Sequence, residues 1–175
     1  DELPAGRTPI ATHLVPINEH PDLFHRAWQR LAEEVSGGRQ GYVVVSRIGD
    51  EESDAEERPT KSLIEVEQWL RSGPLKDLRI ESLHGRLPAD VKDERMSAFA
   101  RGEIDVLIAT TVIEVGVDVP NATMMVIVDA DRFGMSQLHQ LRGRVGRGGH
   151  AGLCILLTEA EADSPARERL TAVAS

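Results

Sequence analysis

The sequence has a single cysteine and very few aromatic residues. One cysteine among 175 residues excludes a zinc site built on several thiolates. Cys154 lies in the apolar run 153–157, which indicates a small buried thiol rather than a nucleophile or a metal ligand. Aromatic residues make up 3% of the chain, too few for the stacking platforms on which other folds hold single-stranded nucleic acid.

Long apolar runs and a leader pattern are missing as well. No stretch approaches the roughly 18 apolar residues that a membrane-spanning helix requires. The segment 1–7 lacks the basic and then apolar pattern of a signal peptide. We therefore expect a soluble, cytoplasmic protein. The chain does not begin with Met, so we also expect it to be a fragment of a longer one.

Positive charge is in the minority. The chain has 20 Lys and Arg residues against 29 Asp and Glu residues, which gives a net charge of −9 and a pI near 5.1. This balance is unlike that of a free-standing nucleic-acid-binding domain, so any contact with DNA must be local. The acidic segment 50–57 is predicted to be a solvated loop, because it lacks the glycine and ligand spacing of a calcium loop.

Two kinds of ligand site have no sequence support. The lysines are Lys61, Lys76 and Lys92, and none follows a glycine, so the Gly-x-x-x-x-Gly-Lys-Ser/Thr phosphate loop is absent. This chain cannot hold a nucleoside triphosphate and magnesium by that route. The histidines show no ligand spacing, and no metal site is predicted; they occupy positions 13, 20, 25, 84, 139 and 150.

What is present is an alternation of short apolar strands and amphipathic helices. Strands are predicted at 10–15, 42–46, 79–83, 105–109, 124–128 and 152–157, the first at a sheet edge. Helices are predicted at 22–35, 62–70, 88–100, across the basic stretch near 137–148, and from about 164. In the first two helices, Leu23 and Trp69 are expected to face inward. The pattern predicts a doubly wound α/β domain with a parallel sheet, whose ligands gather at the carboxyl ends of the strands.

The most distinctive stretch is Gln137–Gly148, which reads QLHQLRGRVGRG. If it is a helix that runs into a loop, Gln140, Arg144 and Arg147 are spaced i, i+4, i+7 and share one face. Glycines precede both arginines, although each would cost about 1 kcal/mol in a helix interior. Guanidinium groups beside glycines suit phosphate oxygens that approach the backbone closely. The alternative is a solvated basic helix end that complements the helix dipole.

Three other strand ends carry candidate ligand groups. Thr110 and Thr111 could offer hydroxyl and N–H groups to a phosphate, or could form a plain helix N-cap pair. Gly116 and Asp118 place an acidic acceptor beside a position where the backbone can approach a ligand, such as a ribose hydroxyl. The Gly85-Arg86 pair offers a small residue and a cation to a nucleic-acid backbone.

These segments resemble motifs of a known class of enzymes. Thr110–Asp118 is similar to motif V, and Gln140-x-x-Gly-Arg-x-Gly-Arg147 to motif VI, of superfamily-two helicases, whose motor consists of two RecA-like lobes. The segments 83–87, 108–122 and 132–148 closely resemble the bacterial RecG family of branched-DNA helicases. The resemblance extends over nearly the whole chain. It implies a RecA-like doubly wound fold and an ATP-dependent DNA helicase, whose first lobe binds most of the ATP and Mg²⁺.

The resemblance also implies roles for individual residues. Arg147 would be the arginine finger, Arg144 a second contact to the γ-phosphate, and Gln140 a residue coupled to that site. Gly116 and Asp118 would meet the ribose side of the nucleotide. The implied contacts to the DNA backbone are Thr110 and Thr111, Gly85 and Arg86, and the turn at Ser46 and Arg47. Val115 departs from many relatives, which have a basic residue at that position.

The expected domain division follows from the same resemblance. Residues 1–9 would be the link between the lobes, 10–158 the second motor lobe, and 159–175 the start of a further helical element. The predicted function is the remodelling of stalled replication forks and Holliday junctions in DNA repair and recombination. Its partners would be branched DNA and the first lobe and DNA-wedge domain of the same protein. Two alternatives remain open: a transcription-repair coupling factor, or a non-catalytic nucleotide-binding α/β module.

Overall fold

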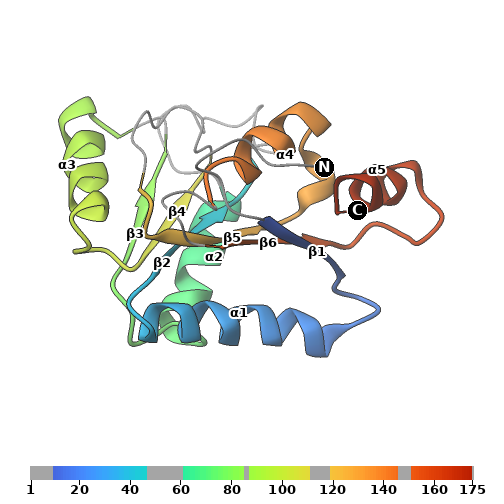
Figure 1. Cartoon of the computed structure of the whole chain (residues 1–175), viewed down its shortest axis with the longest axis horizontal. Coiled ribbons are helices and arrows are strands. Elements are labelled where there is room, and N and C mark those ends of the chain that lie inside the picture. The colour runs from blue at the N-terminus through green and yellow to red at the C-terminus, as the bar shows by residue number, and fades with distance from the viewer. Residues whose placement is uncertain (1–9, 47–60, 85–86, 111–118, 146–150, 175) are drawn as a thin grey trace.

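The computed structural model describes residues 10–46, 61–84, 87–110, 119–145 and 151–174 (Figure 1). At its centre is a six-stranded sheet in the order β1-β6-β5-β2-β4-β3. All of its strand pairs are parallel. The strands are β1 (Ile10–Pro16), β2 (Gln40–Val44), β3 (Ile80–Leu83), β4 (Val106–Ala109), β5 (Ala122–Ile127) and β6 (Gly152–Thr158). The helices are α1 (Pro21–Ser36), α2 (Lys61–Ser72), α3 (Ala89–Ala100), α4 (Met135–Arg142) and α5 (Pro165–Ala174).

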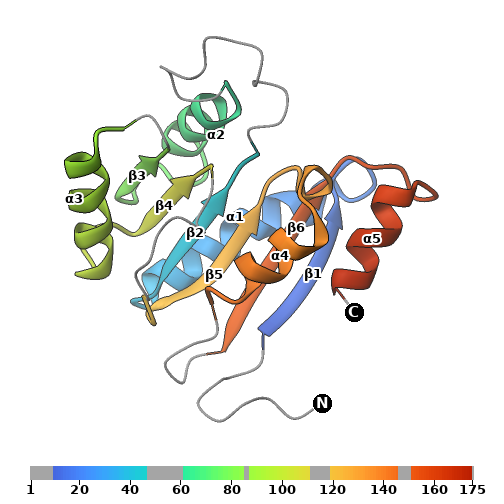
Figure 2. The same cartoon turned by 90° about the horizontal axis from the view of Figure 1, so that it is seen from above.

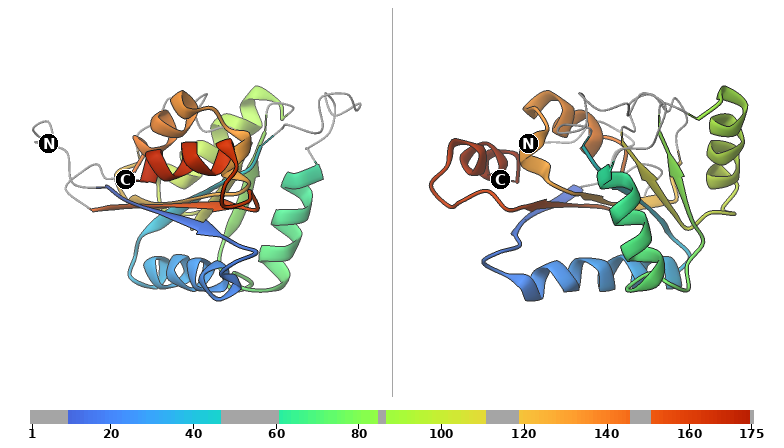
Figure 3. Two further views of the ribbon diagram at one scale, coloured as in Figure 1. Left: turned by 90° about the vertical axis from the view of Figure 1, so that its right-hand side faces the viewer. Right: turned by 180° about the vertical axis from the view of Figure 1, so that it is seen from behind.

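Helices cover both faces of this sheet, so the predicted doubly wound α/β fold is confirmed. Figure 3 shows α1 and α2 on one side of the sheet and α3, α4 and α5 on the other. The side chains of β2 alternate between two cores: Tyr42 and Val44 pack toward α3–α5, and Val43 and Val45 toward α1–α2. A strand buried on both faces explains the continuous apolar run that predicted it.

A buried polar group ties the amino-terminal edge of the sheet to α3. The Gln40 side chain is 3% exposed, and its Nε2 donates to the carbonyl oxygens of Phe99 at 2.6 Å and Ile104 at 2.8 Å. Asn121 Nδ2 donates to Gln40 Oε1 at 3.1 Å. Since buried amides are costly unless they are satisfied, this network fixes how α3 returns to the sheet.

Two residues that were predicted to face inward are exposed instead. Leu23 is 41% and Trp69 40% exposed. The inward stripe of α2 runs from Leu63 to Leu70, both almost fully buried, and Trp69 lies about 100° around the helix from Leu70. The Trp69 ring therefore rests at the margin of the helix, 5.5 Å from the ring of Phe24 on α1.

The helix after the last strand packs into the same core as the rest of the domain. Leu170 and Val173 of α5 are each 1% exposed. Arg167 Nη1 lies 2.8 Å from Glu19 Oε2, in the turn between β1 and α1. The described part of the segment 159–175 thus packs against the domain formed by the preceding residues. The segment 1–9, expected to be a linker, lies outside the described residues.

Candidate functional site

The basic stretch begins on a helix that is firmly seated on the sheet. Gln137 Oε1 accepts a hydrogen bond from the Gly134 N–H at 3.0 Å, which satisfies one of the free donors at the start of α4. Leu138 and Leu141 are each 1% exposed and pack into the α3–α5 core. The apolar residues of this helix thus face the core, and Gln140 is exposed to solvent.

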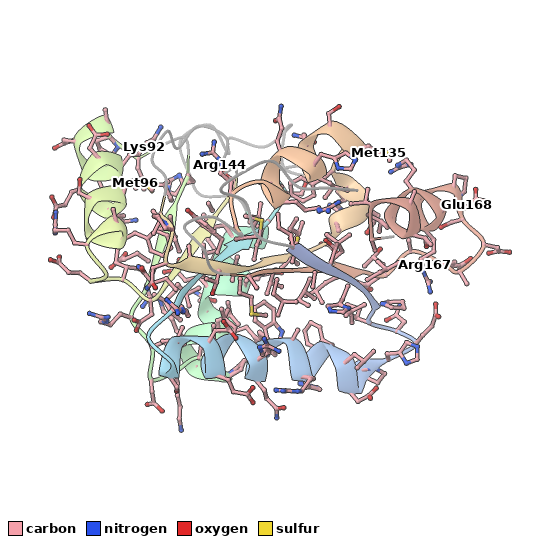
Figure 4. All side chains as sticks on the ribbon, in the orientation of Figure 1. Lys92, Met96, Met135, Arg144, Arg167 and Glu168 are labelled. Atoms are coloured by element: carbon pink, nitrogen blue, oxygen red, sulfur yellow. The ribbon has the colours of Figure 1, made fainter. Side chains whose placement is uncertain are left out.

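The helix ends earlier than the spacing of the arginines suggested. It ends at Arg142, and Gly143 to Val145 form a turn in which Arg144 is half-buried and Val145 is 1% exposed. The predicted helix that runs into a loop is thus observed, and Arg144 lies just beyond the helix end, where its N–H donates to the Leu141 carbonyl oxygen at 3.0 Å. The third member of the predicted i, i+4, i+7 set, Arg147, lies outside the described residues. In Figure 4, Arg144 stands on the same side of the sheet as Lys92 of α3.

We name residues 142–145 the arginine turn. Contacts with the rest of the domain hold its first and its last residue in place. Arg142 Nη1 donates to the Val173 carbonyl oxygen of α5 at 3.0 Å. Val145 inserts into the core at the other end. Between these anchors, Arg144 is carried by backbone that is held in place, so binding of an anion would need to order only its side chain and not the turn itself.

Gly143 is a glycine that the isolated fold does not require. Its φ of −66° and ψ of −8° are ordinary helical values that any residue adopts. Among the described residues, a Cβ at this position would meet the carbonyl oxygens of Gln140 at 3.4 Å and His139 at 3.7 Å, which is ordinary contact. A glycine at such a place lets a ligand or a second body approach the backbone more closely than a larger residue would.

The second group of candidates lies at the carboxyl edge of the sheet. Ser46 and Thr110 follow β2 and β4, which are adjacent, and Val45 N donates to Ala109 O at 2.9 Å between them. The structure therefore brings these two predicted residues together. Both are buried, at 7% and 4% exposed. Within the described ranges, the Thr110 hydroxyl has no hydrogen-bond partner.

The remaining predicted site residues lie outside the described residues. They are Arg47, Gly85, Arg86, Thr111, Gly116, Asp118 and Arg147. Among the predicted site residues, the structure thus gives the position of Ser46, Thr110, Gln140 and Arg144 only.

Sequence reasoning missed one residue at the carboxyl edge, Asp129. It follows β5, whose neighbours are β2 and β6, and it adopts a left-handed conformation with φ of 53° and ψ of 53°. Burial raises the pKa of its carboxyl group, against the lowering effect of the positive charge on Arg132. A polar residue directly after a buried strand was the signal that selected Thr110, and the same rule would have selected Asp129. Strained backbone of this kind is common at functional sites.

Two negative findings apply to the described part of the chain. No group of three or more His, Cys, Asp or Glu residues is placed to hold a metal ion there. No helix in the same ranges is long and apolar enough to cross a membrane.

Comparison with known proteins gives agreeing results. Residues 31–149 match the helicase conserved C-terminal domain family. The chain is 54% identical over 177 residues to the ATP-dependent DNA helicase RecG of Mycobacterium tuberculosis, covering 99% of this chain and 24% of that protein. It is also similar to a RecG bound to a three-way DNA junction, with 38% identity and a TM-score of 0.75 over 99% of this chain and 21% of that one.

A more distant likeness bears on the fold alone. Saccharomyces cerevisiae Dbp5, bound to RNA and ADP BeF3, gives a TM-score of 0.63 at 17% identity, over 96% of this chain and 38% of that one. The chain spans about a quarter of the length of the RecG proteins that it matches.

Proposed function

The chain belongs to the family of helicase conserved C-terminal domains, and from that premise we propose that it is the second motor lobe of a RecG-type ATP-dependent DNA helicase. The single observation that supports this most strongly is the identity of 54% to RecG across 99% of the chain. The whole protein would act in the cytoplasm on stalled replication forks and Holliday junctions, in DNA repair and recombination. A related RecG is bound to a three-way DNA junction, which supports branched DNA as the substrate class.

In this proposal the arginine turn completes a nucleotide site that the first lobe begins. The chain has no glycine-rich phosphate loop with a lysine, so ATP and Mg²⁺ would be held mainly by that other lobe. The residues present here fit a polyphosphate: Arg144 lies on a turn held by Arg142 and Val145, and the glycine before it carries no side chain that would hinder a phosphate from approaching the backbone. ATP bound between the lobes would supply a γ-phosphoryl group whose transfer to water releases free energy.

The predicted nucleotide-site residues would each have a separate role. Arg147 would neutralise the charge that develops on the γ-phosphoryl oxygens, and Arg144 would hold the same group from a second direction. Gln140, exposed on α4, would donate to or accept from groups of the first lobe beside the nucleotide. Gly116 and Asp118 would meet the ribose, with the carboxylate accepting from a hydroxyl group.

The carboxyl edge of the sheet would face DNA. Thr110 and Ser46 lie side by side there, and Thr111, Arg47, Gly85 and Arg86 follow the same strand ends in sequence. Because the Thr110 and Ser46 side chains are buried, we propose that backbone N–H groups and the neighbouring arginines make most of the phosphate contacts. Such contacts carry no sequence information, in keeping with a motor that moves along DNA.

The test is ATP hydrolysis by the full-length protein with a DNA junction present. We expect Arg147→Ala to lower turnover by on the order of a thousandfold or more, as for other arginine fingers, while the protein still binds ATP. The isolated chain should hydrolyse no ATP.

Arg101→Ala is the matched control, because Arg101 is a half-exposed arginine just after α3, paired with Glu103 and outside the proposed site. It should leave turnover unchanged. Full turnover by Arg147→Ala would refute the proposed role of Arg147.

A further inference from the structure

Helix α3 carries a lysine on the side that packs against the sheet. Lys92 lies one turn before Met96 and two turns before Phe99, and those two side chains are 7% and 0% exposed. Because residues spaced i, i+4 and i+7 share one helical face, Lys92 begins the inward stripe of α3. Lys92 is partly buried, and Figure 4 shows it above Met96, nearer the start of the helix. An apolar residue is usual on such a stripe, so the charge at this position needs an explanation.

The start of α3 lies at the carboxyl edge of the sheet. Directly after the end of β3, the Leu87 N–H donates to the His84 carbonyl oxygen at 3.3 Å. The Lys92 N–H then donates to the Pro88 carbonyl oxygen at 3.0 Å. Figure 2 shows β3 and β4 next to α3. Side chains of a helix lean toward its amino terminus, so the Lys92 side chain leans toward the ends of these strands.

The Lys92 ammonium group has no partner within the described ranges. One turn further along α3, Arg95 donates to the Ser82 carbonyl oxygen at 2.5 Å and lies 3.7 Å from a Glu81 carboxylate oxygen. Lys92 makes no hydrogen bond or ion pair of this kind with any described side chain. A partly buried lysine usually keeps its ammonium group in water or beside a carboxylate. Since the domain supplies no carboxylate, this cation is available to an anion from outside.

The neighbouring strand end offers a second polar group without a partner. Thr110 follows β4, and its N–H donates to the Leu83 carbonyl oxygen of β3 at 3.4 Å. The Thr110 side chain is 4% exposed, and its hydroxyl group has no hydrogen-bond partner in the described part of the chain. Buried polar atoms of this kind are uncommon, and a bound ligand is one way to satisfy them. Two adjacent strand ends thus lead to groups that the domain leaves unsatisfied.

The proposed nucleotide site lies elsewhere on the same side of the sheet. Helix α4 belongs to the crossover from the carboxyl end of β5 to the start of β6, its parallel neighbour. It therefore carries the chain back toward the amino-terminal edge, and the arginine turn follows it. Lys92, in the first turn of α3, lies instead at the carboxyl edge, where Ser46 and Thr110 are placed.

We propose that Lys92 binds a phosphate group of the DNA backbone. This inference rests on the proposed function, in which the carboxyl edge of the sheet faces DNA. The ammonium group is a compact charge with three donors, so it suits a phosphate without selecting a base. The contact adds an ionic interaction to a chain whose net charge of −9 otherwise repels DNA.

The salt dependence of DNA binding by the full-length protein tests this role. Each neutralised phosphate releases counterions, so a plot of log affinity against log salt concentration steepens by about 0.9 per contact on duplex DNA. Binding of a fluorescein-labelled three-way DNA junction is followed by anisotropy between about 50 and 200 mM NaCl. Lys92→Gln should reduce the slope by about one and weaken binding at low salt about threefold, whatever the sequence of the arms. Lys92→Arg should keep the slope of the wild type.

Lys76→Gln is the matched control. Lys76 is an exposed lysine in the turn between α2 and β3, at the opposite edge of the sheet, and it too has no partner among the described residues. This variant should bind DNA with the slope of the wild type. The KM for ATP at saturating DNA should be the same in all variants. Because the slope counts ionic contacts, it does not depend on the fraction of the protein that is active.

The possible failures are distinguishable. An unchanged slope for Lys92→Gln, an equal reduction by Lys76→Gln, or a raised KM for ATP in place of the altered slope would overturn the role of Lys92 and leave the proposed function standing. If the wild-type protein binds no junction, the proposed function fails and the role of Lys92 fails with it.

Discussion

At the scale of single residues, Asp129 combines a left-handed backbone with a half-buried carboxyl group whose pKa is raised by burial. A raised pKa means that the folded state holds its proton to a higher pH than the unfolded chain. Stability is therefore lost as pH rises from the ordinary value of 3.8 through the raised pKa, and the penalty is fully present above the raised pKa.

Asp129→Asn should consequently stabilise the protein at pH 7, because asparagine has no charge and tolerates the left-handed region. We expect a gain of about 0.5 kcal/mol, since solvent partly screens a half-buried group. Thermal midpoints measured at pH 7 and pH 3 check this, with the gain absent at pH 3. Asp163→Asn, at an exposed position, should change neither midpoint. An equal or lower midpoint for Asp129→Asn at pH 7 would contradict the role of burial.

The burial of a single residue could be predicted from the sequence where the apolar character of its neighbours was enough to determine it. Cys154 is fully buried, as its apolar neighbours indicated, and burial raises its pKa to about 12. Trp69 was predicted wrongly because apolar character alone does not distinguish the centre of an inward stripe from its margin. That distinction depends on the neighbouring helix, since Trp69 packs against Phe24 of α1.

At the scale of elements, a substitution at Gly143 distinguishes an effect on the stability of the fold from an effect on the proposed site. Gly143→Ala should leave the thermal midpoint unchanged or raise it slightly, because the backbone is helical there and the added Cβ makes only ordinary contacts. In the full-length protein the same change should lower DNA-stimulated ATP hydrolysis by about tenfold or more, since a methyl group would displace the nucleotide or the first lobe.

Gly41→Ala provides the opposite case. A Cβ there would lie 2.5 Å from Leu31 Cδ1 and 3.2 Å from the Met124 carbonyl oxygen, so it should lower the midpoint by several degrees. If Gly143→Ala lowers stability as Gly41→Ala does, or leaves ATP hydrolysis intact, glycine at position 143 does not serve the proposed site.

Strands and helix ends were largely predictable because local chemistry sets them. The run from Tyr42 to Val45 is apolar and β-branched and is buried on both faces; Pro21 begins α1, and Gly37 and Gly38 end it. The end of α4 was not predictable in this way. Gly143 keeps helical angles, the N–H groups of Arg144 and Val145 donate to the carbonyl oxygens of Leu141 and Arg142, and Val145 inserts into the core. That insertion depends on tertiary packing, which the spacing of arginines does not encode.

At the scale of the whole molecule, the order of strands and helices follows from their alternation along the chain, and the parallel sheet from the right-handed crossovers between them. The sequence did not indicate which face of the sheet carries the arginine turn. The arginine turn lies on the α3–α5 side of the sheet, and α1 and α2 cover the other side, so the proposed nucleotide site belongs to one face only.

The most direct measurement is a crystal structure of the full-length protein with a non-hydrolysable ATP analogue bound between its two lobes. We predict that the guanidinium groups of Arg144 and Arg147 lie within about 3 Å of the γ-phosphate oxygens, the distance of a charge-assisted hydrogen bond. A closed complex in which both side chains point away from the γ-phosphate would contradict the central claim.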